Sequence, residues 1–194
     1  MHKEDPGTPG NTIHLRELTG TTLLRLHSLE PFARLCEAMK AGGVSLPGRV
    51  NHCFGQDPAA LCLAPRQWLL CSESPHGERL MSQLEPLIDP HHTALLDTSA
   101  GLAIFRLAGK AAPWLLSKLG GLDFHSATAA GAHCARTRLQ HVAVTIHYHQ
   151  AAGEPGQSVF DLIADRSIAA WLGQLLTASI PHAEHLYHHY GART

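Results

Sequence analysis

Histidine is the most prominent residue type with chemistry of its own in this chain, at 16 of 194 residues. Within the segment 141–149, apolar and polar residues alternate as they do in a half-buried strand. Successive side chains of a strand point to opposite faces, so His141, His147 and His149 would share one face. Imidazoles that converge in this way can bind Zn²⁺ or Cu²⁺, which makes this face a candidate metal site.

Two further groups of histidines have less specific spacing. His182, His185 and His189 would share one face of a helix, and His91 and His92 are adjacent. No HExxH motif and no cysteine at a ligand spacing accompanies any of the groups. A polar sheet face and a His-rich polar tail are the simpler interpretation. We therefore predict no metal site, and the strand face remains the weaker, metal-binding alternative.

Carboxylates and serines offer little support for acid–base or nucleophilic catalysis. Asp97, Asp123 and Asp165 each adjoin a turn or the start of a helix, where a carboxylate accepts hydrogen bonds from backbone N–H groups. Ser99 lacks the Gly-x-Ser-x-Gly context of a nucleophile elbow. No Gly-x-Gly-x-x-Gly or phosphate loop is present. The sequence predicts no catalytic residue and no cofactor bound by this chain.

Two arginines lie in equivalent positions of an internal repeat. The residues from Gly20 to His27 match those from Gly101 to Ala108, and both stretches place Arg-Leu after two large apolar residues. An arginine inside an apolar strand either points outward, pairs with a carboxylate or meets an anionic ligand. For Arg25 and Arg106 these alternatives stay open.

The elements around the repeat define the fold. In the second copy a strand over 102–107 precedes a helix over 111–119, which ends at paired glycines that we expect to form a left-handed cap. Each copy continues with two strands and a second helix, the order of a ferredoxin-like α+β unit. We predict one compact domain of two such βαββαβ-type units. The expected divisions are a flexible arm (1–18), a first unit (19–99), a second unit (100–180) and a His-rich tail (181–194).

Composition excludes several classes of protein. The formal net charge is −1, without the basic stripe of a nucleic-acid-binding protein. No apolar run approaches the ~18 residues of a membrane span. Five cysteines, an odd number without a Cys-x-x-Cys pair, indicate reduced, packed thiols in a cytoplasmic protein.

Short motifs spread over 46–176 resemble the gamma subunit of heterotetrameric sarcosine oxidase, a family related to glycine-cleavage T-protein-like folate-binding proteins. They include an Asp-x-Ser element, a strand ending in Leu-x-Gly, an Asp-Phe pair and a Thr-x-Leu strand. Their residues here are Asp97, Ser99, Leu107, Gly109, Ala112, Leu122, Asp123, Phe124, Gly131, Thr137 and Leu139. Gly120-Gly121 stands where the family has Gly-Cys, which marks a divergent member.

This resemblance implies a function in a complex. A gamma-type chain would be a non-catalytic subunit that supports an alpha subunit, together with beta and delta subunits. The complex would demethylate sarcosine oxidatively and pass the one-carbon unit to tetrahydrofolate. Flavin, NAD and tetrahydrofolate would be bound by the partner subunits.

A second interpretation belongs to a different class. A stand-alone T-protein-like chain, which could form a homo-oligomer, would bind tetrahydrofolate in the hollow between its two units. Asp97, Arg106 and Arg136 would then contact the pterin or the glutamate tail.

Overall fold

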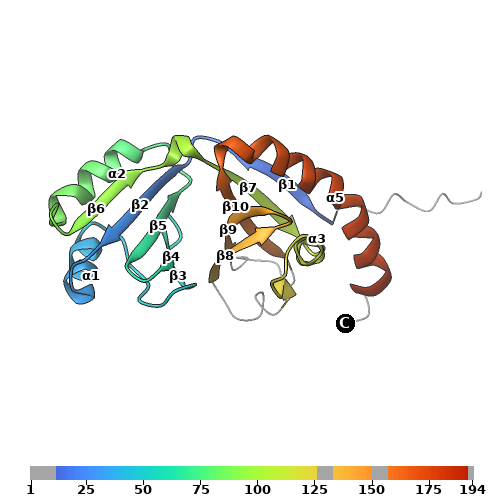
Figure 1. Cartoon of the computed structure of the whole chain (residues 1–194), viewed down its shortest axis with the longest axis horizontal. Coiled ribbons are helices and arrows are strands. Elements are labelled where there is room, and N and C mark those ends of the chain that lie inside the picture. Colours follow the sequence, from blue (N-terminus) through green and yellow to red (C-terminus); the bar gives the residue numbers. More distant parts are fainter. Residues whose placement is uncertain (1–11, 126–132, 150–156, 192–194) are drawn as a thin grey trace, which may run out of the picture.

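The computed structural model describes residues 12–125, 133–149 and 157–191. Two five-stranded antiparallel sheets face each other, and helices cover their outer sides (Figure 1). The predicted duplicated α+β architecture is confirmed. None of the helices within these residues has the length and apolar character needed to cross a membrane.

The first unit follows the ferredoxin-like order. In chain order its elements are β2 (Thr22–Ser28), α1 (Phe32–Ala41), β3 (Cys53–Phe54), β4 (Ala59–Ala64), β5 (Gln67–Ser72), α2 (Gly77–Leu84) and β6 (Thr93–Asp97). The strand order in the sheet is β3-β4-β5-β2-β6, so the first strand of the βαββαβ series lies between the third and the fourth.

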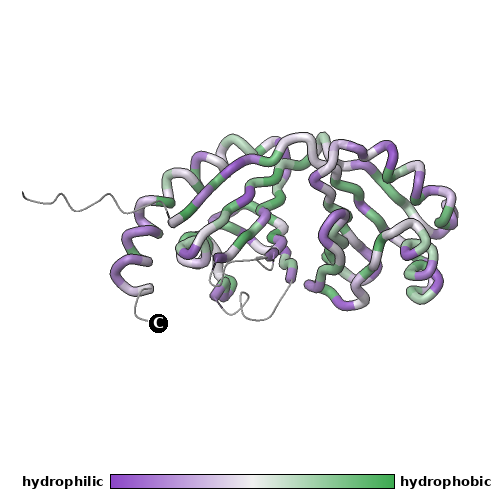
Figure 2. Tube along the Cα trace, turned by 180° about the vertical axis from the view of Figure 1, so that it is seen from behind, coloured by the Kyte–Doolittle hydropathy of each residue, from purple (hydrophilic) through white to green (hydrophobic). Residues whose placement is uncertain are grey.

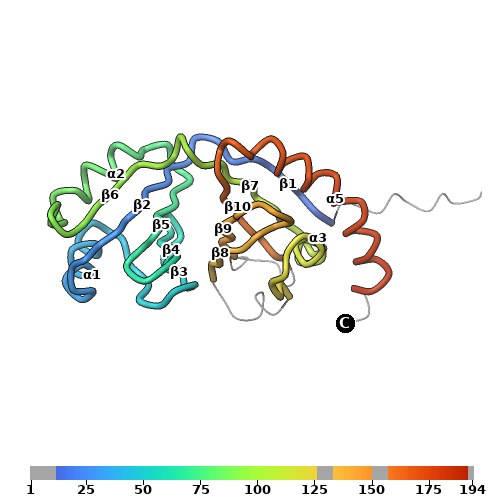
Figure 3. Tube along the Cα trace, in the orientation of Figure 1, coloured from blue at the N-terminus to red at the C-terminus, as the bar shows by residue number. Residues whose placement is uncertain are grey.

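The second unit repeats this arrangement with one difference. Its elements are β7 (Leu102–Gly109), α3 (Ala112–Leu119), β8 (His133–Leu139), β9 (Val142–His149), β10 (Ser158–Asp165) and α5 (Ala169–Tyr190), in the sheet order β1-β7-β10-β9-β8. The strand in the place of β6 is β1 (His14–Leu18), which comes from the start of the chain. Figure 3 shows β1 beside β7 in the second unit, from where the chain passes to β2 in the first.

The structure corrects the predicted arm, because residues 14–18 form β1. This strand pairs antiparallel with β7, whose edge would otherwise have unpaired N–H and C=O groups. Glu184 of α5 holds the beginning of the strand, since its carboxylate accepts hydrogen bonds from the backbone N–H groups of Thr12 (2.7 Å) and Ile13 (3.2 Å). Gly109, at a φ of +131°, allows the Thr12 carbonyl to come so close that a Cβ would clash with it. Residues 1–11 lie outside the described residues.

The His-rich tail is also more ordered than its sequence predicts. Helix α5 continues through Pro181 to Tyr190, and Ala183 is fully buried against the second sheet. The helix continues because the packing of Ala183 and the hydrogen bonds of Glu184 with Thr12 and Ile13 hold this part of it in place. Its outer end is mostly hydrophilic (Figure 2). The rings of His185 and His189 meet there edge to face, with centroids 4.4 Å apart.

The end of α3 differs from the predicted left-handed cap. Gly120 is extended, with φ −134° and ψ 163°, and forms a β-bridge with Leu139. A Cβ at Gly120 would lie 3.0 Å from a methyl group of Leu139 and 3.2 Å from the Arg138 carbonyl oxygen. The glycine is therefore needed for the close approach of β8 rather than for its handedness.

The fold has four layers, in the order helices, sheet, sheet, helices, and an apolar core fills each of the three spaces between them. One fills the space between α1, α2 and the first sheet, and a second lies between α3, α5 and the second sheet. The third joins the inner faces of the sheets through residues such as Leu23, Leu69, Ile104 and Ile163. Cys53 and Cys134 belong to it, and burial raises the pKa of their thiols to about 11 and about 12. These thiols therefore pack as protonated, unreactive groups.

Candidate functional site

The inner face of the second sheet carries a group of charged and polar side chains that we call the Arg106 network: Arg106, Asp161, His147, His149 and Glu73. Arg106 on β7 lies directly opposite Asp161 on β10. Its Nε and one terminal nitrogen donate to the two carboxylate oxygens of Asp161, each at 2.7 Å. Another terminal nitrogen contacts Glu73 Oε1 at 2.6 Å. Because Glu73 follows β5, this arginine links the two units.

The histidines of β9 complete the network. His147 is the cross-strand partner of Asp161 and is 4% exposed. His149 lies two residues further along the same face, and its Nε2 is 2.6 Å from Asp161 Oδ2. The two imidazole rings are 3.9 Å apart, centroid to centroid. Asp161 thus contacts a guanidinium and an imidazole at the same time.

The ionisation of these groups follows from burial and from their partners. Burial alone would raise the pKa of Asp161, but hydrogen bonds from Arg106 and His149 outweigh burial and lower this pKa to about 2. Burial, reinforced by His149, lowers the pKa of His147 to about 3. The hydrogen bond to Asp161 raises the pKa of Arg106. Near neutral pH, Asp161 is a carboxylate, Arg106 a cation and His147 a neutral imidazole.

This arrangement stabilises the structure rather than performing acid–base catalysis. A general base needs a pKa near the working pH and a free lone pair, whereas Asp161 has a pKa of about 2 and both oxygens bonded. Potential ligand atoms of His147, His149 and Asp161 lie within 4.8 Å of one another. However, ligands of one tetrahedral Zn²⁺ are roughly 3.3 Å apart, and the His149–Asp161 contact is a hydrogen bond of 2.6 Å. The cation of Arg106 further opposes a divalent ion. The third histidine of the strand-face group, His141, is exposed in the turn before β9.

A cleft lies between the two sheets at the other ends of β9 and β10. Its volume is about 630 Å³, and residues of β2, β5, β8, β9 and β10 line it. Three arginines, Arg25, Arg136 and Arg138, are among them, and all three are exposed. Leu69 and Ile163 contribute apolar walls. We call this space the inter-sheet cleft.

The structure does not bring Asp97, Arg106 and Arg136 together. Asp97 accepts hydrogen bonds from the backbone N–H of Ser99 (2.8 Å) and from its hydroxyl (2.5 Å), as expected for a turn, and it lines a different hollow beside α2. Arg106 belongs to its network, and Arg136 lines the inter-sheet cleft. Their predicted contact with a folate stays a prediction.

The other candidate carboxylates have the local roles that their positions indicate. Asp165 accepts from the N–H (2.9 Å) and the hydroxyl (2.6 Å) of Ser167, and so caps the short 3₁₀ turn that precedes α5. Asp123 accepts from the backbone N–H of His125 at 3.0 Å.

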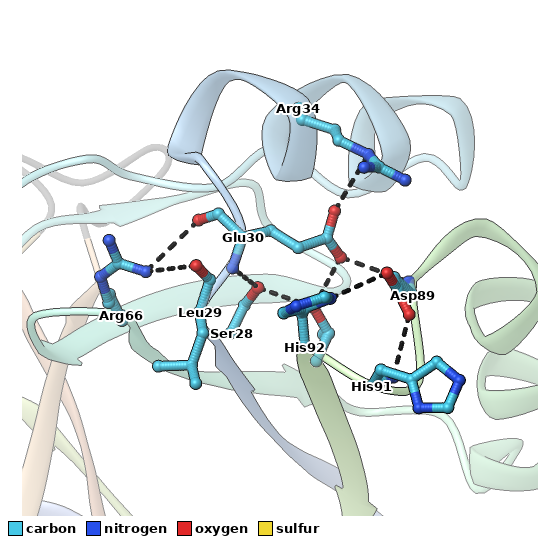
Figure 4. Close-up of polar contacts among 9 residues, drawn as sticks. Ser28, Leu29, Glu30, Arg34, Arg66, Asp89, His91 and His92 are labelled. Carbon is cyan, nitrogen blue, oxygen red and sulfur yellow. Dashed lines mark hydrogen bonds and ion pairs between the residues drawn. The ribbon is translucent and has the colours of Figure 1, made fainter.

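A second polar network surrounds Glu30, at the far end of the first unit (Figure 4). Its carboxylate accepts from the Thr93 hydroxyl at 2.7 Å and from the Asp89 N–H at 3.2 Å, and it pairs with Arg34 at 3.2 Å. Arg66 donates to the Leu29 carbonyl at 2.6 Å. These bonds fix the loop between β2 and α1 against the start of β6, which is a structural role.

The adjacent histidines His91 and His92 belong to the same region. Asp89 accepts from the backbone N–H of His91 and contacts the ring of His92, each at 2.9 Å (Figure 4). These hydrogen bonds, that of His92 foremost, lower the pKa of Asp89. The histidine pair thus closes a turn.

Asp161 and Glu73 are the residues of the Arg106 network that sequence reasoning missed. For Asp161 a signal was present, because it is the single charged residue in the apolar run of residues 159–164. Such a carboxylate in a buried strand needs a cation. For Glu73, which follows β5 in a loop, only the folded arrangement reveals the contact.

Comparison of the fold with solved structures gives the structural class of the chain. The structure matches the glycine cleavage system aminomethyltransferase T from Bartonella henselae with a TM-score of 0.62 and 14% identity, over 85% of this chain and 45% of that one. The chain therefore has a T-protein-like fold, as predicted. No protein-family model matches it.

The particular relatives are subunits of sarcosine oxidase. The chain is 31% identical over 124 residues to the sarcosine oxidase subunit gamma of Corynebacterium sp. (strain P-1). The aligned residues cover 61% of this chain and 59% of that protein. It is 25% identical over 142 residues to the gamma subunit of an Arthrobacter species, over 72% and 69% of the two chains. The match to the first relative thus spans less than two thirds of its length.

A solved structure supports the same relationship at the level of the fold. A chain of the heterotetrameric sarcosine oxidase from Corynebacterium sp. U-96, in complex with pyrrole 2-carboxylate, matches with a TM-score of 0.77 and 23% identity. The match covers 90% of this chain and 87% of that one. The resemblance to sarcosine oxidase gamma subunits is confirmed.

Proposed function

We propose that this chain is a non-catalytic, gamma-type subunit of a sarcosine oxidase-like complex. It would support an alpha subunit, in an assembly that also contains beta and delta subunits. The complex would demethylate sarcosine oxidatively and transfer the one-carbon unit to tetrahydrofolate, with flavin, NAD and tetrahydrofolate on the partner subunits. We place this assembly in the cytoplasm.

The observation that carries this proposal is the similarity to two gamma subunits, combined with a fold match over nine tenths of the chain. The chemistry of the described residues is compatible with it. Apart from buried thiols, whose pKa is raised by burial, the titratable groups with strongly shifted pKa there belong to the Arg106 network, where they contact one another. This network joins the two units of a scaffold, which suits a supporting subunit.

Co-expression tests the proposal directly. The tagged full-length chain is produced with the alpha, beta and delta subunits of the same organism, and a parallel preparation omits alpha. We expect a stable complex that oxidises sarcosine. When alpha is absent, the tagged chain should no longer co-purify with the other subunits. Elution of the tagged chain alone in the presence of all three subunits would contradict it.

The tetrahydrofolate-binding alternative is supported by one observation, the position of Arg136 in a cleft between the two units of a T-protein-like fold. Calorimetric titration of the isolated chain with tetrahydrofolate distinguishes the two functions. A purely structural subunit gives no heat of binding. Saturable binding that Arg136→Gln weakens would favour the alternative.

A further inference from the structure

The inter-sheet cleft concentrates positive charge from both units of the fold. Arg25 comes from β2 of the first sheet, and Arg136 and Arg138 come from β8 of the second. Arg136 and Arg138 are two residues apart on one strand, so their side chains leave the same face. That face is the inner one, because Cys134 on the same side belongs to the core between the sheets. The three guanidinium groups therefore approach one space from two sides.

The described residues do not neutralise the charge in the cleft. Asp165 is the single carboxylate among the residues that line the cleft. One of its oxygens is already bonded to the Ser167 backbone and hydroxyl. Throughout 12–125, 133–149 and 157–191, no ion pair joins Arg25, Arg136 or Arg138 to a carboxylate. The lining thus carries an excess of two positive charges in a chain whose formal net charge is −1.

The size of the cleft suits a small molecule. Its volume of about 630 Å³ lies within the usual range of ligand pockets, roughly 300–1,000 Å³. A sphere of that volume is roughly 11 Å across, close to the Debye length of ~10 Å at 0.1 M salt, so the fields of the three arginines overlap. Leu69 and Ile163 provide apolar walls for the uncharged part of a ligand.

We propose that the inter-sheet cleft binds a small organic anion with at least two acidic groups, held between Arg25 on one sheet and Arg136 and Arg138 on the other. A guanidinium binds a carboxylate or a phosphate through two parallel N–H···O bonds, and two acidic groups can engage arginines on both sheets. A ligand of this kind would also link the two units at this end of the interface, as the ion pair between Arg106 and Glu73 does at the other end. The proposal does not depend on assembly with other subunits.

Calorimetry on the isolated full-length chain provides the test. Citrate is the carboxylate probe and pyrophosphate the phosphate probe, each titrated at low and at moderate salt. We expect saturable binding of at least one probe, weakening as salt rises because screening reduces the attraction. Which probe binds more tightly identifies the acidic group. Absence of binding of both probes at millimolar concentration would overturn the proposal.

Variants show whether a bound probe occupies the cleft. Arg25→Gln and Arg138→Gln should each weaken binding roughly tenfold, the loss expected for one charge-assisted bidentate contact. Arg49→Gln is the matched control, because Arg49 is exposed, carries the same charge and lies outside the cleft lining. Equal affinity of the wild type, Arg25→Gln and Arg138→Gln would place the probe elsewhere and refute the site. Thermal unfolding of each variant verifies that it is folded.

Discussion

The two ends of the interface between the sheets carry equivalent arginines with opposite surroundings. Arg25 on β2 and Arg106 on β7 occupy matching positions of the repeat, and both point toward the facing sheet. Arg106 contacts two carboxylates and is mostly buried, whereas Arg25 is exposed in an open cleft. The repeat thus preserves the residue without preserving its role.

The neighbours on the adjacent strands account for the difference. On β10 the residue opposite Arg106 is Asp161, and on β5, the corresponding strand, the residue opposite Arg25 is Leu69. One strand further, the second unit has His147 and the first has Leu61. A polar pair therefore neutralises one arginine, while an apolar pair leaves the other to solvent or to a ligand. Exchanging these residues between the units tests this explanation.

The largest effect should follow acidification, because His147 is buried in its neutral form. The unfolded state takes up a proton near pH 6.5, but the folded state does so only near the pKa of about 3. Stability is therefore complete above pH 6.5 and is lost as the pH falls toward 3. At ~1.4 kcal/mol per pH unit, the upper bound of this loss is ~5 kcal/mol. Chemical denaturation at a series of pH values measures it.

Replacement of His147 by leucine, the residue at the equivalent position of the first unit, tests this assignment. His147→Leu should flatten the dependence of stability on pH between 6.5 and 3. His27→Gln, which changes an exposed histidine lining the inter-sheet cleft, should leave the slope as it is in the wild type. An unchanged slope in His147→Leu would refute this assignment.

Asp161→Leu gives the second unit the leucine that the first unit has at the equivalent position, Leu69. It leaves Arg106 with Glu73 alone, so we expect a loss of about 3–5 kcal/mol in the free energy of unfolding, the usual cost of removing one partner from a buried ion pair. Asp165→Ala, on the same strand, should cost much less because it removes an exposed cap. Similar losses in the two variants would show that Asp161 is not an internal counter-ion.

The double variant Asp161→Leu/Arg106→Met removes the charge together with its partner. We expect it to recover at least ~1–2 kcal/mol relative to Asp161→Leu, because no unpaired cation then remains between the sheets. Denaturant titration of both variants gives this difference. A double variant less stable than Asp161→Leu would mean that Arg106 contributes mainly through its contact with Glu73.

Arg25→Gln should have the smallest effect. The side chain is exposed and has no ion pair among the described residues, so its free energy of unfolding should stay within about 0.5 kcal/mol of the wild type. Arg106→Gln, the same change at the equivalent position, should cost about 2–3 kcal/mol. The two arginines would have similar structural roles if both substitutions cost the same.

Much of this architecture can be read from the sequence, because the repeated Arg-Leu strands, the paired glycines and the alternating segments are local signals. The sequence also limits each arginine to pairing, exposure or ligand contact, and the structure shows pairing for Arg106 and exposure for Arg25. The choice depends on the register of β5 and β10, which sets Leu69 or Asp161 opposite the arginine. Register between strands distant in sequence leaves no local pattern.

The same reason explains two of the predictions that the structure corrects. Residues 14–18 have no strong strand pattern, and they form a strand because β7 offers an unpaired edge. Gly120 was expected to end a helix in a left-handed cap, but its small size allows contact with a strand almost twenty residues later. Tertiary neighbours decide both cases.

The origin of β1 has a consequence for how the chain is made and divided. Residues 14–18 are synthesised well before their partner strand β7, which is complete only at residue 109, and before Glu184. The first unit can fold during synthesis, whereas β1 has no partner strand until β7 has been made. A cut between 99 and 100 would therefore yield one complete unit and one that lacks a strand. Restored helical and strand signals on adding a peptide of residues 12–19 to the fragment 100–194 would demonstrate this dependence.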